Sequence, residues 1–190
     1  GSDGSISWED IHARYHAELA NGFGNLASRV AAMIGKSFDG SLPAAGASTQ
    51  AEQKVIDLVA AAVADADAAI DAVAPQDALT AVWRIVDELN GYITEQAPWK
   101  VAKEDPDSDR LATILATAAE GLRVLAVLLN PVIPKASAVL WDSLGAESAL
   151  GALAEQRIDG VAAWGQLPAG SPVTKPSSLF PRIEAAAAAQ

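Results

Sequence analysis

Three polar residues lie four positions apart on the first predicted helix. Asn21, Asn25 and Arg29 form this row, and each step of four turns about 40° around a helix axis, so the row slants toward the flank of the apolar stripe. Amide and guanidinium groups supply the donors and acceptors needed to contact the Watson–Crick edges of unstacked bases. An ordinary solvated helix surface has the same composition, so the row alone leaves both interpretations open.

A tryptophan next to a proline is the second element that could take part in binding. In Ala97-Pro98-Trp99, Pro98 must end or redirect the preceding helix. A Trp at such a corner is either part of the core or an exposed platform on which a base stacks, worth about 1–3 kcal/mol per base. The residue pattern favours neither alternative over the other.

The net charge of −11 opposes nucleic-acid binding, because phosphate contacts usually appear as a basic excess. Only a local basic surface would answer this objection. The candidates for it are Arg14, Arg29, Lys36, Lys100 and Lys103. Of these, Lys36, Lys100 and Lys103 are the candidates for contacts with a phosphate backbone.

Other motifs with apparent chemistry have simpler interpretations. Gly22-Phe23-Gly24-Asn25-Leu26-Ala27 matches a dinucleotide fingerprint, but the residues before it are already helical, and the fingerprint requires a strand that turns into a helix. We interpret it as a helix made thin for close packing. His12 and His16 lie on one helical face without a third ligand, so we interpret them as surface histidines. The sequence therefore predicts neither a metal site nor a catalytic residue.

The composition is that of a folded, helix-rich protein. Of 190 residues, 51% are hydrophobic and 19% are charged, which favours a domain with a real core. The absence of cysteine excludes disulfides and thiol catalysis and fits a cytoplasmic protein. Because Arg123 and Pro131 interrupt the most apolar region, no stretch reaches the roughly 18 uncharged apolar residues of a membrane span. We expect no membrane contact.

Apolar spacings of three and four predict an antiparallel bundle of about five helices, an all-α fold. Its first helix, Trp8 to Lys36, carries the polar row. A capping box from Thr49 to Glu52 opens the second helix, Pro75 separates it from the third, and Pro98 ends the third. The fourth predicted helix follows Asp105-Pro106-Asp107, with Pro in its first turn. The fifth predicted helix spans Lys135 to Leu144.

The fourth of these helices is apolar nearly all round between Leu111 and Leu129, which predicts a central position. After residue 145 the periodicity fades and Gly, Pro and Ser become frequent. We therefore divide the chain into a helical bundle, residues 1–145, and an irregular C-terminal extension, residues 146–190.

Four stretches in this order resemble methionyl-tRNA synthetases, and together they cover almost the whole chain. The Pro-x-x-Pro region after the fourth helix recurs among related class I synthetases, so it indicates the type of bundle. The other three point to methionine. They are Leu19 to Arg29 with its Asn-Leu-Ala-x-Arg row, Tyr92 to Lys100 with its Ala-Pro-Trp corner, and Val173 to Ile183 with its Leu-Phe-Pro-Arg-Ile ending.

The resemblance implies an anticodon-binding domain for methionine tRNA. By resemblance, Asn21, Asn25 and Arg29 face the anticodon loop, and Asn25 and Arg29 hydrogen-bond the first anticodon base, a cytosine. Trp99, supported by Pro98, stacks against the splayed bases. The physical roles agree with this division, because stacking tolerates any base, whereas hydrogen bonds to base edges discriminate.

The catalytic signatures of the family are missing. Histidines occur only at positions 12 and 16, which excludes a His-x-Gly-His motif, and no Lys-Met-Ser-Lys-Ser loop surrounds Met33. The resemblance therefore implies that ATP, magnesium and methionine attachment belong to a separate catalytic domain of a longer enzyme. We expect this fragment to need no cofactor, to be inactive alone and to have that domain and the tRNA stem-loop as partners, with no DNA partner.

In the family, the tail packs back toward the catalytic domain. The resemblance thus implies that Leu179, Phe180 and Ile183 contact a missing surface, and that Val173 to Ile183 is loosely held in the isolated domain. Two alternatives remain open. One is the anticodon domain of another class I synthetase, and the other, which the acidic charge favours, is a helical protein-interaction module on the same scaffold.

Overall fold

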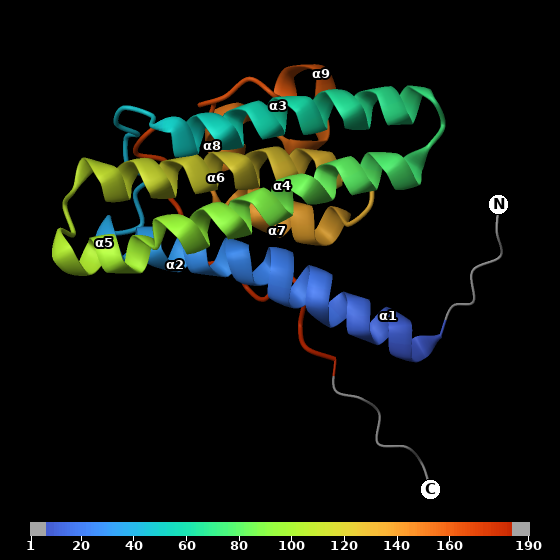
Figure 1. Ribbon diagram of the computed structural model, residues 1–190, viewed down its shortest axis with the longest axis horizontal. Coiled ribbons are helices and arrows are strands. Elements are labelled where there is room, and N and C mark those ends of the chain that lie inside the picture. The colour runs from blue at the N-terminus through green and yellow to red at the C-terminus, as the bar shows by residue number, and fades with distance from the viewer. Residues whose placement is uncertain (1–6, 184–190) are drawn as a thin grey trace, which may run out of the picture.

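A continuous helical segment runs along one side of the molecule from Trp8 to Ser37 (Figure 1). It consists of α1 (Trp8–Arg14), η1 (Tyr15–Gly24) and α2 (Asn25–Ser37). The Ser7 side chain caps α1 by accepting a hydrogen bond from the Asp10 amide at 3.0 Å. The prediction of one long first helix is confirmed, but η1 is wound as a π-helix. Such widened turns are rare and cluster at functional sites.

Two long antiparallel helices follow, and the second of them also contacts η1. They are α3 (Gln50–Asp71) and α4 (Pro75–Gln96), and Figure 1 shows them as a hairpin. The predicted capping box is present, since Thr49 and Glu52 satisfy each other's backbone amides. Contrary to the expectation of a plain corner, a further short helix, α5 (Pro98–Glu104), follows α4 directly.

The central helix is α6 (Asp109–Leu129), which lies between α2 and the α3–α4 hairpin. Most of its residues are buried on every side, as its apolar composition predicts. Gly121 permits close contact with α4, because a Cβ there would lie 2.7 Å from the Leu89 side chain. Contrary to the expectation that no stretch is long and apolar enough, α6 would suffice by length and composition to cross a membrane, but 89% of its apolar window is buried inside the bundle.

The start of α6 differs from the sequence-based expectation. Pro106 was expected in the first turn, whereas the helix begins at Asp109 with Ser108 as its N-cap. The Ser108 hydroxyl accepts a hydrogen bond from the Leu111 amide at 3.3 Å. A serine cap offers the first-turn amides an acceptor that proline lacks, which explains the later start.

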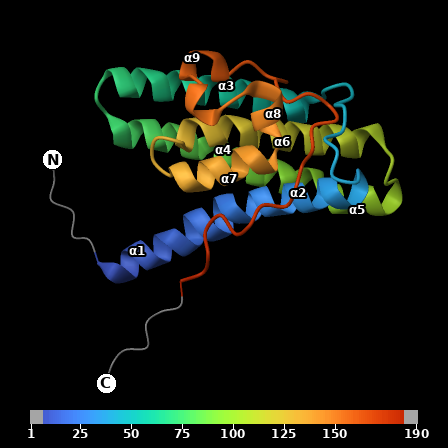
Figure 2. The same ribbon diagram turned by 180° about the vertical axis from the view of Figure 1, so that it is seen from behind.

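The structure describes residues 7–183, and within this range the C-terminal part is irregular, as predicted. After α7 (Pro134–Ser143) come α8 (Ala146–Leu150), the 3₁₀ turn η2 (Leu153–Glu155) and α9 (Ile158–Val161). The final segment then passes back along α2 and η1 (Figure 2). The all-α helical bundle is thus confirmed.

A buried ion pair on α6 attaches the extension to the bundle. The Glu120 carboxylate accepts the Arg123 Nε–H at 2.8 Å and the backbone amides of residues 165–167 at 3.0 to 3.1 Å. Arg123 Nη2 donates to the carbonyl oxygens of Val161 and Ala163 at 2.8 and 3.0 Å. Because both side chains are nearly inaccessible and fully partnered, their charges are compensated inside the core.

The tail residue Phe180 packs on the bundle itself. It is 9% exposed, and its ring lies 6.0 Å from the Phe23 ring and 6.2 Å from the Tyr15 ring. Gly24 makes room for it, since a Cβ there would lie 3.1 Å from the Phe180 ring. This is the thin helix that the glycine motif predicted. Ile183, by contrast, is 52% exposed.

Candidate functional site

The predicted polar row lies where the π-helix returns to ordinary α-helix. Asn21 belongs to η1, Asn25 is the first residue of α2, and Arg29 follows one turn later. Both asparagines are exposed and Arg29 is half-buried. Among residues 7–183, the side chains of these three form no hydrogen bond, so their donors and acceptors are available to a ligand.

A groove of about 300 Å³ opens beside this row. One wall comes from the first helical segment and includes Asn21, Asn25 and Ser28. The other comes from the tail and includes Ser178 and Arg182. Sequence reasoning gave no role to Ser28, Ser178 or Arg182, because only the fold brings the tail against the first helix. The remaining lining residues are Ala20, Gly24, Leu179 and Phe180.

The predicted tryptophan corner lies next to the end of this row. Helix α4 ends at Gln96, Ala97 adopts a left-handed conformation with φ of 43°, and Pro98 begins α5. Pro98 is buried, whereas Trp99 is 43% exposed. The Arg29 Cζ atom lies 5.2 Å from the centre of the Trp99 ring, within the range of a cation–π contact. The structure therefore places Trp99 at the surface beside Arg29.

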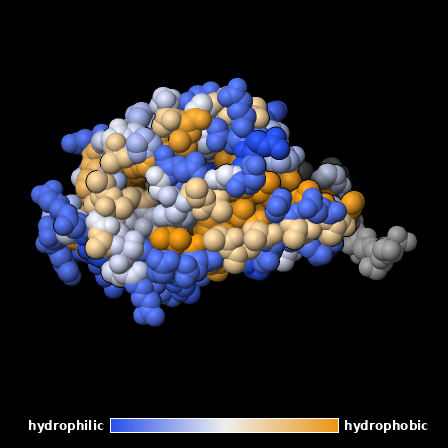
Figure 3. All heavy atoms as spheres, turned by 90° about the horizontal axis from the view of Figure 1, so that it is seen from above, coloured by the Kyte–Doolittle hydropathy of each residue, from blue (hydrophilic) through white to orange (hydrophobic). Residues whose placement is uncertain are grey.

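The basic candidates separate into two groups. Lys36, Lys100 and Lys103 are exposed, and the face of the molecule seen in Figure 3 carries hydrophilic and hydrophobic residues side by side. Arg14 belongs to α1 at the end of the molecule opposite α5, and its Nε–H donates to the Glu18 carboxylate at 3.0 Å. Among the residues that the structure describes, Lys100 and Lys103 form no ion pair, so unpaired positive charge lies next to Trp99 on α5.

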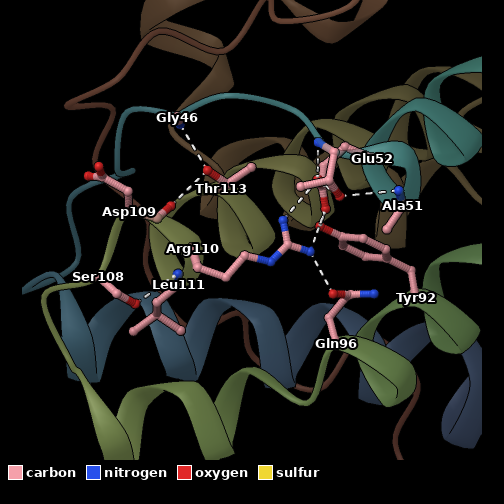
Figure 4. Close-up of polar contacts among 11 residues, drawn as sticks. Gly46, Ala51, Glu52, Tyr92, Gln96, Ser108, Asp109, Arg110, Leu111 and Thr113 are labelled. Atoms are coloured by element: carbon pink, nitrogen blue, oxygen red, sulfur yellow. Dashed lines mark hydrogen bonds and ion pairs between the residues drawn. The ribbon is translucent and has the colours of Figure 1, made fainter.

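A buried polar cluster includes Gln96, the last residue of α4 before the tryptophan corner (Figure 4). Glu52 of α3 is 1% exposed and accepts hydrogen bonds from Arg110 Nη1 at 2.8 Å and Nη2 at 2.9 Å. The Tyr92 hydroxyl and both the amide and the hydroxyl of Thr49 also donate to this carboxylate. Arg110 Nη2 additionally donates to the Gln96 Oε1 atom. The cluster therefore joins α3, α4 and α6 at the end of α4.

The protonation states of this cluster follow from burial and hydrogen bonding. Burial alone would raise the pKa of Glu52, but hydrogen bonds from Arg110, Tyr92 and Thr49 lower that pKa to about 2. Burial and the hydrogen bond to Glu52 raise the pKa of Tyr92. The hydrogen bond to Glu52 raises the pKa of Arg110. At neutral pH the cluster is a charged Glu–Arg pair with a neutral tyrosine.

His12 and His16 contact each other, with their Nε2 atoms 3.1 Å apart. Both Nε2 atoms also lie within 3.1 Å of the Ile183 carbonyl oxygen. Within the described part of the chain, no three His, Cys, Asp or Glu side chains gather in a way that would hold a metal ion. The histidines therefore serve here as contacts between α1, η1 and the tail.

Comparison with known proteins identifies methionine–tRNA ligases as relatives. Residues 42–190 match the family described as the anticodon binding domain of methionyl tRNA ligase. A methionine–tRNA ligase of Streptomyces coelicolor is 60% identical over 187 residues, which are 97% of this chain and 35% of that protein. One from Lactiplantibacillus plantarum is 38% identical over 97% of this chain and 27% of its own length.

Solved structures agree with the sequence comparison. The free form of Mycobacterium tuberculosis methionyl-tRNA synthetase is 31% identical, with a TM-score of 0.86 over 97% of this chain and 36% of that one. The same enzyme bound by methionyl-adenylate gives a TM-score of 0.84 over 94% of this chain and 34% of that one. The chain thus spans about a third of the length of the relatives it matches.

Proposed function

Because the chain belongs to the family of methionyl-tRNA ligase anticodon-binding domains, we propose that it binds the CAU anticodon loop of methionine tRNA. The binding surface consists of Asn21, Asn25 and Arg29 on the first helical segment and of Pro98 and Trp99 at the α4–α5 corner. Lys36, Lys100 and Lys103 contact the phosphate backbone around it. Bound RNA replaces solvent along the groove between the first segment and the tail.

The single observation that carries this proposal is the contact between Arg29 and Trp99. An exposed aromatic ring 5.2 Å from a guanidinium combines a stacking platform with a hydrogen-bond donor in one place. A protein-interaction module has no need for this pairing beside free amide side chains. The pairing outweighs the objection from net charge because the exposed lysines of α5 lie at the same corner.

Stacking and hydrogen bonding have separate roles in this proposal. The Trp99 ring stacks on a splayed base and supplies affinity that depends little on sequence. Asn25 and Arg29 hydrogen-bond the edge of the first anticodon base, a cytosine, and supply discrimination, because a wrong base leaves donors or acceptors without partners. Asn21 lies on the same groove wall as Asn25 and extends the polar edge.

The second partner in this proposal is the catalytic domain of the same enzyme, which attaches methionine to the tRNA using ATP and magnesium. The residues described here do not fit a magnesium or nucleotide site, because no acidic cluster is formed and the Gly22–Ala27 motif is helical. Because the chain spans about a third of the length of its relatives, we propose that this chain alone does not catalyse aminoacylation, and we assign it to the cytoplasm. Residues 1–145 form the RNA-binding bundle, and residues 146–190 pack on that bundle and on the catalytic domain.

The testing experiment titrates the chain with anticodon stem-loops of identical stem and different loops. Binding that is tightest for the CAU loop supports the proposal. Preference for another anticodon indicates a different class I specificity. No binding to any loop at low salt indicates a protein-interaction module.

A further inference from the structure

The α4–α5 corner that carries Trp99 contains an unfavourable backbone conformation. Ala97 has a φ of 43°, a left-handed conformation that a residue with a Cβ rarely adopts and that usually falls to glycine at a helix end. Within the corner, the Ala97 amide donates to the Ile93 carbonyl at 3.1 Å and the Lys100 amide donates to the Ala97 carbonyl at 2.7 Å, but no side chain caps the start of α5. Contacts with other parts of the fold must therefore hold the corner in place.

The only polar side chain that anchors the last residue of α4 within the described structure is Arg110. Its Nη2 donates to Gln96 Oε1, and Gln96 directly precedes the left-handed Ala97. In Figure 4 the guanidinium lies between the Gln96 amide and the Glu52 carboxylate. A planar guanidinium bound to a carboxylate through two nitrogens has little freedom to rotate. Gln96 therefore contacts a fixed donor.

The Glu52 carboxylate, which binds Arg110 on the side away from Gln96, is itself held in place. Glu52 is almost inaccessible and receives hydrogen bonds from Thr49 and Tyr92 in addition to Arg110. It also belongs to the capping box of α3. The series Glu52–Arg110–Gln96 thus connects the rigid start of α3 to the last residue before the corner.

We propose that Gln96 and Arg110 are positioning residues for Trp99, and that their contact sets the orientation in which the indole faces Arg29 and a stacked base. This inference rests on the proposed RNA-binding function. A rotation of the last turn of α4 would carry Pro98 and Trp99 with it, because Pro98 starts the next helix at once. The alternative is that the cluster only stabilises the fold.

A double-mutant cycle separates these two roles. Gln96→Leu removes the acceptor while keeping a similar size, and Arg110→Lys keeps the charge near Glu52 but loses the planar fork. Each is combined with Trp99→Ala, and binding of a CAU stem-loop is measured by fluorescence anisotropy. The matched control is Arg84→Lys, which alters another arginine–carboxylate bridge, to Asp65 at 2.9 Å, three turns from the corner.

If the inference holds, Gln96→Leu and Arg110→Lys each weaken binding about fivefold or more when Trp99 is present, the lower end of what loss of one stacked base produces. In the Trp99→Ala background the same changes have less than a roughly twofold effect, because the residue through which they act is absent. Arg84→Lys has no effect in either background. Equal losses in both backgrounds, or no loss in either, would overturn the inference.

A second readout is independent of RNA. In protein labelled with 5-fluorotryptophan, the Trp99 resonance, identified by its absence in Trp99→Phe, shifts or broadens in Gln96→Leu and Arg110→Lys but not in Arg84→Lys. An unchanged resonance refutes positioning even if RNA does not bind. Failure of Trp99→Ala to weaken binding refutes the proposed function instead, so the two failures are distinguishable.

Discussion

The Arg29 guanidinium carbon lies 5.2 Å from the centre of the Trp99 ring, although the two residues belong to helices far apart in the sequence. A contact of this kind at an exposed site contributes about 0.5–1 kcal/mol. Its larger consequence is geometric. It brings a guanidinium donor and an exposed aromatic ring together, the combination that the proposed function requires and that neither the first helix nor the α4–α5 corner provides alone.

Replacing Trp99 by alanine is expected to weaken binding to every anticodon stem-loop by about 1–3 kcal/mol, because stacking does not depend on base identity. Trp99→Phe should retain part of the affinity. The measurement is a set of dissociation constants for several loops. Trp8→Ala is the control, since Trp8 is 82% exposed but belongs to α1 at the opposite end of the molecule. A loss confined to one loop sequence would contradict a general stacking role.

Removing Lys100 and Lys103 together should flatten the salt dependence of binding. Each phosphate contact with single-stranded RNA contributes roughly 0.7 to the slope of log affinity against log salt concentration. The double alanine variant should therefore lose about 1.4 from that slope. Lys135→Ala serves as the control, because this exposed lysine lies on α7, away from α5. An unchanged slope would show that the RNA does not reach α5.

Acid should destabilise the fold through Glu52. Its pKa is about 2 in the folded protein against an ordinary value of 4.5, so between these values the unfolded chain binds a proton that the folded chain does not. The stabilisation is complete above about pH 5 and is lost as the pH falls toward 2. It amounts to something on the order of 3 kcal/mol.

Urea unfolding from pH 7 to pH 3 measures this effect. As the pH is lowered, the free energy of unfolding should decrease less in Glu52→Gln than in the unmodified chain. The substitution also changes stability by an amount that does not depend on pH, which leaves this comparison unaffected. The other carboxylates are common to both proteins and cancel in the comparison. Parallel pH profiles would mean that the Glu52 carboxylate is not selectively stabilised by its hydrogen bonds.

The tail is expected to be the least stable described part of the isolated chain. Within residues 7–183, no backbone amide after Thr174 donates a hydrogen bond inside the chain, whereas Val173 and Thr174 still donate to the carbonyls of Gly40 and Ser143. Amides of residues 175–183 should therefore exchange much faster than those of α6. Phe180→Ala should accelerate exchange at Val173 and Thr174 as well.

Hydrogen exchange with mass spectrometry distinguishes the outcomes. Ile183→Ala, which truncates a half-exposed side chain, is the control and should change little. Strong protection throughout residues 173–183 would show that the tail is firmly bound without a catalytic domain. No response to Phe180→Ala would mean that its contact with Phe23 does not hold the tail.

The long helices could be predicted because their signals are local. The capping box at Thr49 and Glu52 and the apolar stripes predicted where the helices lie in the sequence. The apolar residues on nearly every face of α6 predicted its central place. The π-helical winding of η1 had no such local signal. Likewise, nothing in the sequence indicated that the capping residue Glu52 also pairs with Arg110, since that contact joins distant helices.

The candidate site was predictable in composition but not in geometry. The spacing of Asn21, Asn25 and Arg29 and the family resemblance identified the residues. Whether Trp99 was buried or exposed depended on the left-handed Ala97 and on the helix that begins at Pro98, which local propensity does not specify. Arg182 was missed for a similar reason, because the tail's position beside the first helix is a long-range feature.

The most direct test of the central claim compares stem-loops with C, U or G at the first anticodon position, using the unmodified chain and Arg29→Ala. The unmodified chain should prefer the C loop by about 1–3 kcal/mol, the cost of leaving buried polar groups unpaired. In Arg29→Ala, the difference in binding free energy between the C loop and the other loops should become smaller, and binding to the C loop should lose the most affinity. Equal affinity of the unmodified chain for all three loops, or an equal loss for all three in Arg29→Ala, would contradict recognition of the anticodon by this surface.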